Sequence, residues 1–263
     1  MTASTISDKR EKNKKFIYKL CAIAFWIIVW EALARAVGSD LIICSPIVAF
    51  KRLLALITTP DFRKAIAFSA LRILSGFFAA LILGIFLAAL SSKAAIIKAL
   101  LEPITAVIKA TPVASFIILA IIWFGSRNLS MFISFLMVFP VVYLNVLEGI
   151  ESADRGLIEM SRVFRIGRVK TLLYVYFPQL LPFLISGCSV ALGLCWKSGI
   201  AAEVIGISTG SIGERLYRAK LYFETGDLLA WTAVIIIVST VFERLFMLLL
   251  KLLKNKVEGA ARK

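Results

Sequence analysis

The chain has 263 residues, of which 60% are hydrophobic and only 18% are charged, yet its formal net charge is +15. A soluble globular chain is about half apolar and about a quarter charged, and a chain of this size has too much surface to bury such an apolar excess. The composition therefore excludes an ordinary soluble domain and indicates a protein that spans a lipid membrane.

The apolar runs predict six membrane-spanning helices, since a span needs about 20 apolar residues. The first run, at 20–37, follows a basic segment and could be a signal peptide. It is longer than a typical signal-peptide core and shows no clear small-x-small cleavage site, so we expect an uncleaved first span. The other five spans are predicted at 68–90, 104–124, 129–149, 177–201 and 228–250.

Two of these spans contain prolines and lysines. Lys109 and Pro112 interrupt the third span, and Pro178, Pro182 and Lys197 lie in or next to the fifth. A proline is tolerated in a membrane helix only where neighbouring groups bind the backbone groups that it leaves free. We therefore expect both helices to lie inside a bundle.

The basic residues predict the orientation of the chain. With six spans both termini lie on one side, and eighteen lysines and arginines fall on that side. Eight fall on the other side, namely Lys51, Arg52, Arg63, Lys64, Arg127, Arg215, Arg218 and Lys220. Because cytoplasmic loops carry the excess of basic residues, both termini are predicted to be cytoplasmic. The basic residues flank the spans and do not form one stripe, so membrane orientation explains the charge better than nucleic-acid binding.

One long loop, residues 148–170 between the fourth and fifth spans, shows a helical pattern. An apolar face and a charged face recur at helical spacing, formed by Leu157, Met160 and Phe164 and by Glu151, Arg155, Glu159 and Arg162. Gly167 is expected to end this helix. The helix could simply cover the floor of the bundle. Because its acidic and basic residues alternate, docking to a charged protein partner is the favoured interpretation.

The stretch from Glu159 to Pro178 resembles the cytoplasmic signature of ABC importer permeases, E-A-A-x3-G-x9-I-x-L-P. The E position is Glu159, and the Ala, Ala, Ile, Leu and Pro positions are filled by Met160, Ser161, Val175, Phe177 and Pro178. Arg165 occupies the glycine position, and a glycine follows only at Gly167, so the turn between the two short helices is expected to be shifted. In this family the short helix docks into a groove of the ATPase subunit. The resemblance thus implies docking residues at Glu151, Arg155, Glu159, Met160, Ser161, Arg162 and Gly167.

Further stretches resemble the nitrate/sulfonate/taurine branch of these permeases over about 200 residues. They are Ser69–Phe77, Pro112 with Ile122–Gly125, Ala202–Glu203 and Ser211–Gly213. The resemblance implies an all-α, polytopic fold of the MetI-like type with six transmembrane helices and cytoplasmic N and C termini. The domains are then a basic N-terminus at 1–19, a permease domain at 20–250 and a basic tail at 251–263.

Polar residues at membrane depth are candidates for the translocation path, because a charge there costs a few kcal/mol unless it has a partner or faces water. The candidates are Arg72, Asn145, Trp196, Lys197 and Glu203. Arg72 could extend its charged end to water, and Asn145 could join two helices by a hydrogen bond. Lys197 follows Trp196 in an otherwise apolar run. It could pair within the bundle, or it could favour an anionic solute in the path that the fifth span lines in such permeases.

The sequence offers little for chemistry of its own. It contains no histidine, which removes an imidazole base or metal ligand. It also contains no Gly-x-x-x-x-Gly-Lys-Ser/Thr phosphate loop, so ATP must act through a partner. The four cysteines, at Cys21, Cys44, Cys188 and Cys195, include no C-x-x-C pair, and no metal site is predicted. We expect neither catalytic residues nor a bound cofactor in this chain.

The resemblance implies a permease subunit of an ATP-driven importer in the bacterial inner membrane. Its implied partners are an ATPase dimer that binds ATP and Mg, a second permease copy, an extracytoplasmic substrate-binding protein and lipid. The solute and the choice between homodimer and heterodimer stay open, although a small anion such as nitrate, a sulfonate or taurine is favoured. The alternatives are a secondary transporter or channel, which needs coupling groups at the membrane centre, and an intramembrane enzyme.

Overall fold

The computed structural model describes residues 3–39 and 41–261, and within these ranges the chain forms helices joined by short turns. The long helices are α1 (Ala3–Val37), α3 (Pro60–Ser91), α5 (Val113–Glu151), α8 (Phe177–Gly206) and α10 (Thr225–Ala261). The short ones are α2 (Pro46–Ile57), α4 (Ala95–Ala110), α6 (Arg155–Val163), α7 (Arg168–Thr171), the π-helical turn η1 (Leu172–Tyr176) and α9 (Ile212–Leu221). The predicted all-α fold is confirmed for these ranges. Arg262 and Lys263 of the predicted basic tail lie outside them.

Helices α3, α5 and α8 form the core, and α5 packs along both of the others. The backbones come close because small residues stand at the crossings. A Cβ atom added at Gly76 of α3 would lie 2.2 Å from the Met131 carbonyl oxygen of α5. One added at Gly199 of α8 would lie 2.6 Å from the Ser134 hydroxyl oxygen of α5. Membrane helices associate through this kind of close contact, since lipid supplies no hydrophobic force between them.

Within the residues that the structure describes, five helices are long and apolar enough to cross a membrane. They are Ile17–Val37, Pro60–Ser91, Val113–Glu151, Arg168–Gly206 and Thr225–Asn255. These helices contain five of the six predicted spans. The predicted third span, 104–124, lies partly in α4 and partly in the first part of α5.

That third span is broken, and proline and glycine explain where. Thr111 has an extended backbone (φ −83°, ψ 132°), as expected for a residue before a proline, and Pro112 follows at φ −58°. Gly125, at φ 63°, then separates the first part of α5 from the rest of it. Only glycine adopts this left-handed conformation without strain, so the chain reverses direction here.

The second correction concerns the loop at 148–170, where a single helix to Gly167 was predicted. Glu151 is the last residue of α5, and α6 begins only at Arg155. Gly167 does not end α6; it precedes α7 with an ordinary φ of −59°. The segment predicted as one helix therefore contains the end of α5 and the short helix α6, and α7 begins after Gly167.

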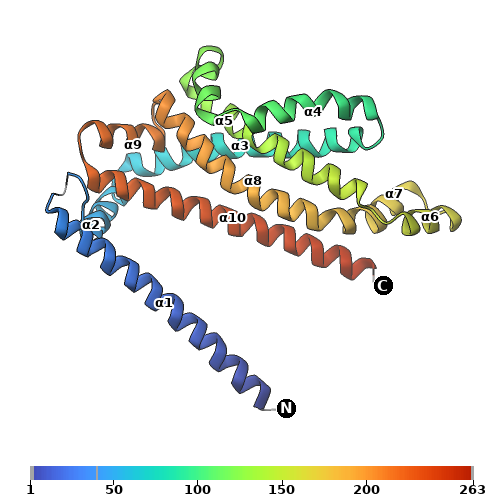
Figure 1. The fold of residues 1–263 in the computed structure, drawn as a ribbon, viewed down its shortest axis with the longest axis horizontal. Helices are drawn as coiled ribbons and strands as arrows, with labels where there is room; N and C mark the ends of the chain where they lie inside the picture. Colours follow the sequence, from blue (N-terminus) through green and yellow to red (C-terminus); the bar gives the residue numbers. More distant parts are fainter. Residues whose placement is uncertain (1–2, 40, 262–263) are drawn as a thin grey trace.

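The elements gather at two opposite ends of the bundle (Figure 1). One end holds α6, α7, the turn between α3 and α4 and the last turns of α10. The other end holds α2 and α9. In Figure 1, α1 diverges from the bundle toward its N-terminal end, and only 6% of its apolar window is buried. The predicted domain boundaries at 19/20 and 250/251 fall inside the continuous helices α1 and α10.

We expect Gly76→Ala to lower the free energy of unfolding by about 2 kcal/mol or more, because the new methyl group meets backbone atoms of α5. Gly193→Ala is the matched control, since no atom lies within 4 Å of a Cβ atom added there. Alanine is the better helix former, so the control should be neutral or slightly stabilising. Titration with SDS, followed by circular dichroism, measures both. Equal midpoints for the two variants would contradict the close α3–α5 contact.

Candidate functional site

The segment between α5 and α8 is held in place by side chains at its start. The Glu151 carboxylate ends α5 and pairs with the Lys98 ammonium of α4 at 2.6 Å, which raises the pKa of Lys98. The Asp154 carboxylate caps α6 by accepting the backbone N–H groups of Gly156 (2.7 Å) and Leu157 (3.4 Å). An ion pair to α4 therefore holds the start of this junction, and a cap on backbone N–H groups holds its end.

Gln179, near the start of α8, ties α6 to that helix. Its side-chain oxygen accepts the backbone N–H of Asp154 at 2.7 Å, and its side-chain nitrogen donates to the Val175 carbonyl at 2.8 Å. Pro178 lacks an N–H, and the π-helical turn η1 lies immediately before it. The side-chain amide of Gln179 thus joins the start of α6 to the start of α8.

The turn after α6 lies where the family pattern places its glycine. Arg165 adopts a left-handed backbone with φ 51°. The N–H of Ile166 donates to the Ser161 carbonyl at 2.9 Å, and the N–H of Arg165 donates to the Arg162 carbonyl at 3.0 Å. This pair of bonds is the Schellman motif that usually has glycine at the left-handed position. The expected shift of the turn is therefore wrong, because Arg165 takes the conformation itself.

The helices α6 and α7 present an exposed apolar surface, which we call the α6–α7 surface. It is formed by Leu157, Met160, Val163, Phe164, Ile166 and Val169. Val163 is 77% exposed and Phe164 is 69% exposed. Of the predicted docking residues, Arg155, Glu159, Met160 and Arg162 are exposed beside it. Ser161 is buried, and its hydroxyl donates to the Ile158 carbonyl.

The candidate path residues do not converge on one point. Lys197 is exposed on α8, on the face that also carries Val190 and Leu194. Trp196 beside it is only 3% exposed, and its ring N–H has no hydrogen-bond partner. Asn145 lies against Gly187 at the α5–α8 crossing and donates to the Val141 carbonyl of its own helix. Of these residues, only Lys197 presents a charge on an open face of α8.

The other two candidates lie toward the end of the bundle that holds α9. Arg72 of α3 packs on the Phe68 ring at 4.0 Å and donates to the Arg127 carbonyl of α5. Glu203 is completely buried and accepts a hydrogen bond from the Ser69 hydroxyl of α3 at 2.7 Å. Sequence reasoning missed Ser69 as its partner, although Ser69 begins the stretch that resembles the permease family.

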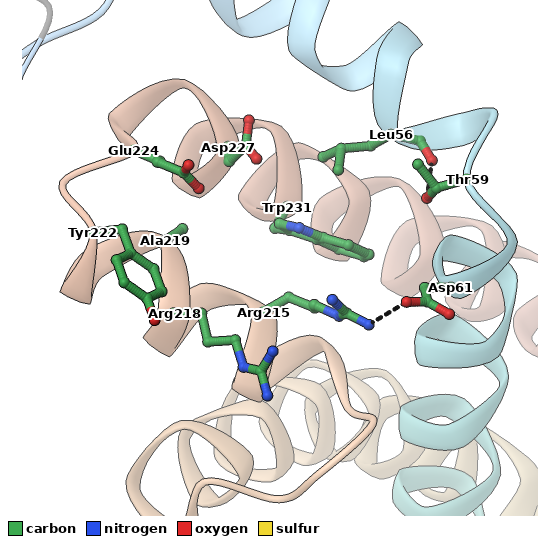
Figure 2. Close-up of a pocket in the computed structure, with 10 residues that line it drawn as sticks. All are labelled: Leu56, Thr59, Asp61, Arg215, Arg218, Ala219, Tyr222, Glu224, Asp227 and Trp231. Carbon is green, nitrogen blue, oxygen red and sulfur yellow. Dashed lines mark hydrogen bonds and ion pairs between the residues drawn. The ribbon is translucent and has the colours of Figure 1, made fainter.

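A cavity of about 350 Å³ opens at the same end, between α2, α3, α9 and α10. Figure 2 shows the Arg215 guanidinium of α9 pointing at Asp61 of α3, with the Trp231 ring above them; the ion pair measures 2.9 Å. Two other charged residues of the lining are also paired, Arg218 with Glu214 at 2.7 Å and Asp227 with Arg52 at 3.5 Å. The cavity therefore has a lining of largely compensated charge.

Comparison with known proteins agrees with this geometry. Residues 80–259 match the family model of binding-protein-dependent transport system inner membrane components. The chain is 27% identical over 238 residues to the taurine transport system permease protein TauC of Escherichia coli, covering 88% of this chain and 86% of that protein. It is 26% identical to the nitrate import permease protein NrtB of Synechocystis, over 85% and 88% of the two chains. A putative aliphatic sulfonates transport permease protein, SsuC of Escherichia coli, is 32% identical over 48% of each chain.

The turn at Arg165 generates a prediction. Arg165→Gly should stabilise the turn by about 1 kcal/mol, because glycine adopts the left-handed conformation without the steric cost of a Cβ atom. Arg162→Gly is the control: the same change inside α6 should destabilise by about 1 kcal/mol. Amide hydrogen exchange at Ile166 measures both effects. Faster exchange at Ile166 in Arg165→Gly than in the parent protein would refute this account of the turn.

Proposed function

Because the chain belongs to the family of binding-protein-dependent transport system inner membrane components, as an ABC importer permease of the nitrate, sulfonate and taurine branch, we propose that it forms the translocation path for a small anionic solute. A partner ATPase binds ATP and Mg and supplies the work. The observation that carries this proposal is the α6–α7 surface, an apolar and mixed-charge surface fixed to the two central helices at one end of the bundle. This chain contributes path and coupling and performs no chemical step.

The chain crosses the inner membrane six times in this proposal, with α4 and the first part of α5 together forming the third crossing. Two contacts support the proposal that the ends of successive crossings alternate between the two ends of the bundle. Lys98 pairs with Glu151 at the end that holds α6, and the Ser208 hydroxyl donates to the Ser126 carbonyl at 2.5 Å at the end that holds α9. The excess of basic residues at the α6 end assigns that end and both termini to the cytoplasm. The permease domain then comprises residues 20–250, between the basic segments 1–19 and 251–263.

The α6–α7 surface docks onto the ATPase subunit. Exposed apolar side chains such as Met160 and Phe164 bury area in a groove, while Arg155, Glu159 and Arg162 match charges around it. Glu151 and Gly167 mark the ends of the docking segment. Because the Gln179 amide binds the start of α6 to α8 and residues 152–154 join α6 directly to α5, motion of the ATPase dimer moves these helices as a unit. Access to the path then alternates between the two sides of the membrane.

The path lies on the open face of α8 that carries Lys197. An ammonium group facing lipid at this depth costs a few kcal/mol, so this face turns toward a water-filled path. A second copy of the chain supplies the other wall, as a homodimer, and an extracytoplasmic binding protein delivers the solute. The relatives are named for transport of taurine, nitrate and aliphatic sulfonates. Nitrate is an anion, and taurine and the aliphatic sulfonates carry a sulfonate anion; a lysine ammonium group attracts both.

Charge reversal at Glu159 tests the docking. Glu159→Lys should weaken binding to the ATPase subunit at least tenfold, about 1.4 kcal/mol, while the chain still folds and inserts. Co-purification with the ATPase subunit measures this. Glu224→Lys, an equally exposed reversal at the opposite end of the bundle, is the control and should leave binding unchanged. Undiminished binding and transport by Glu159→Lys would show that Glu159 does not dock.

Lys197 provides the test of the path. In cells that also express the ATPase and the binding protein, Lys197→Met should reduce uptake of an anionic solute at least tenfold, with a raised KM. Lys197→Arg keeps the charge and should retain most of the uptake. Labelled taurine, nitrate and a short aliphatic sulfonate serve as probes. Uptake by Lys197→Met equal to that of the parent protein rules out a lysine-lined anion path.

A further inference from the structure

Glu203 is the most deeply buried charged residue in the described part of the chain, with 0% of its surface exposed. It lies near the end of α8, one turn before the loop that leads to α9. A buried carboxylate costs several kcal/mol unless hydrogen bonds replace the water that it loses. The hydrogen bonds of the Glu203 carboxylate therefore indicate which parts of the structure it stabilises.

Two groups from two other elements bind one oxygen of this carboxylate. The Ser69 hydroxyl of α3 donates to Oε2 at 2.7 Å, and the backbone N–H of Gly213, in the first turn of α9, donates to it at 3.2 Å. The Ser69 oxygen in turn accepts the N–H of Ile212 at 2.9 Å. The carboxylate also lies at the positive end of the α9 dipole. The Ser69 hydroxyl and the Glu203 carboxylate thus accept hydrogen bonds from the first two N–H groups of α9.

The loop between α8 and α9 is short and makes close contacts on both sides. Ile207 and Gly210 both adopt left-handed conformations, with φ 48° and 83°. The Ser208 hydroxyl donates to the Ser126 carbonyl of α5. A Cβ atom added at Gly213 would lie 2.3 Å from the Cβ atom of Glu203. The N-terminus of α9 therefore lies directly against the Glu203 side chain.

The second carboxylate oxygen indicates which substitution the site tolerates. Oε1 of Glu203 and the hydroxyl oxygen of Ser130 on α5 are both buried without a hydrogen-bond partner, and Ser130 adjoins the carboxylate. A glutamine can keep an oxygen at the Oε2 position and turn its amide nitrogen toward the Ser130 oxygen. Hydrogen bonding at Oε2 is preserved by glutamine and removed by alanine.

We propose that Glu203 is a positioning residue that locks α9 to α8 and α3, so that α9 forms a rigid outer cap that moves with the helix carrying Lys197. The inference rests on the proposed function, in which α8 lines the path. Glu203 lies six positions after Lys197, which is about 9 Å along a helix. A displacement of α8 during transport is therefore passed directly to α9, and the outer opening changes without any loop having to rearrange.

Hydrogen exchange in the purified complex of the chain with its ATPase subunits tests the lock. Glu203→Ala should speed amide exchange at Ile212 and Gly213 at least tenfold, whereas Glu203→Gln should exchange like the parent protein. Asp61→Asn is the matched control, because it removes an exposed ion pair between α3 and α9 and should change little. Slow exchange in Glu203→Ala, or equally fast exchange in Glu203→Ala and Glu203→Gln, overturns the proposal.

Two further measurements complete the test. If Glu203→Ala does not fold, Ser69→Ala replaces it: loss of the hydroxyl should speed exchange at Ile212, and unchanged exchange there overturns the lock. In uptake assays with taurine, nitrate and an aliphatic sulfonate, Glu203→Ala should lower the maximal rate at least tenfold, with unchanged ATPase binding and rescue by Glu203→Gln. An unchanged maximal rate would overturn the positioning role. A parent protein that transports none of these solutes, yet shows the exchange pattern, contradicts the proposed solute class and not the lock.

Discussion

The close packing of α3, α5 and α8 is the contact on which the other features of this protein depend. A Cβ atom has no room at Gly76, where it would meet the backbone of α5, or at Gly199, where it would meet the side chains of Ile73 and Ser134. In a membrane the apolar side chains gain little from leaving lipid, and close van der Waals contact has to stabilise the bundle. Hydrogen bonds add to it, such as that from the Ser134 hydroxyl of α5 to the Cys195 carbonyl of α8 at 3.1 Å.

Each end of the bundle is built by side chains that bind backbone groups of a loop. At one end, the Asp154 carboxylate and the Gln179 amide hold the start of α6. At the other, Glu203 and Ser69 hold the start of α9. Both ends attach to α8, which carries Gln179 in its first turn and Glu203 near its last. A single helix thus connects the end of the bundle that bears the α6–α7 surface with the end that bears α9.

Local sequence patterns predicted the long helices and the position of α6, and they failed where single residues take unusual conformations. The apolar runs indicated five helices correctly. Pro112 breaks the third run, as its position there predicted, because it lacks an N–H; Gly125 then separates the third run from the fourth because it tolerates a positive φ. The end of α6 was assigned to Gly167 because a glycine usually marks a helix end. Arg165 takes that role instead. Its place at the glycine position of the family pattern was the signal that could have identified the turn.

The sequence by itself determined that this chain lies in a membrane, which residues lie in its apolar helices and to which family it is related, because composition, periodicity and motif spacing are properties of neighbouring residues. Only the tertiary structure decided what the polar residues do. Glu203 and Ser69 are 134 residues apart and meet at α9, and Lys98 and Glu151 are 53 residues apart and meet beside α6. Such pairs form when helices pack against one another. A local sequence pattern does not encode such pairs, because the effect of a buried carboxylate depends on what surrounds it. The Glu203 carboxylate would be costly in lipid, and it is stabilising against the N-terminus of a helix.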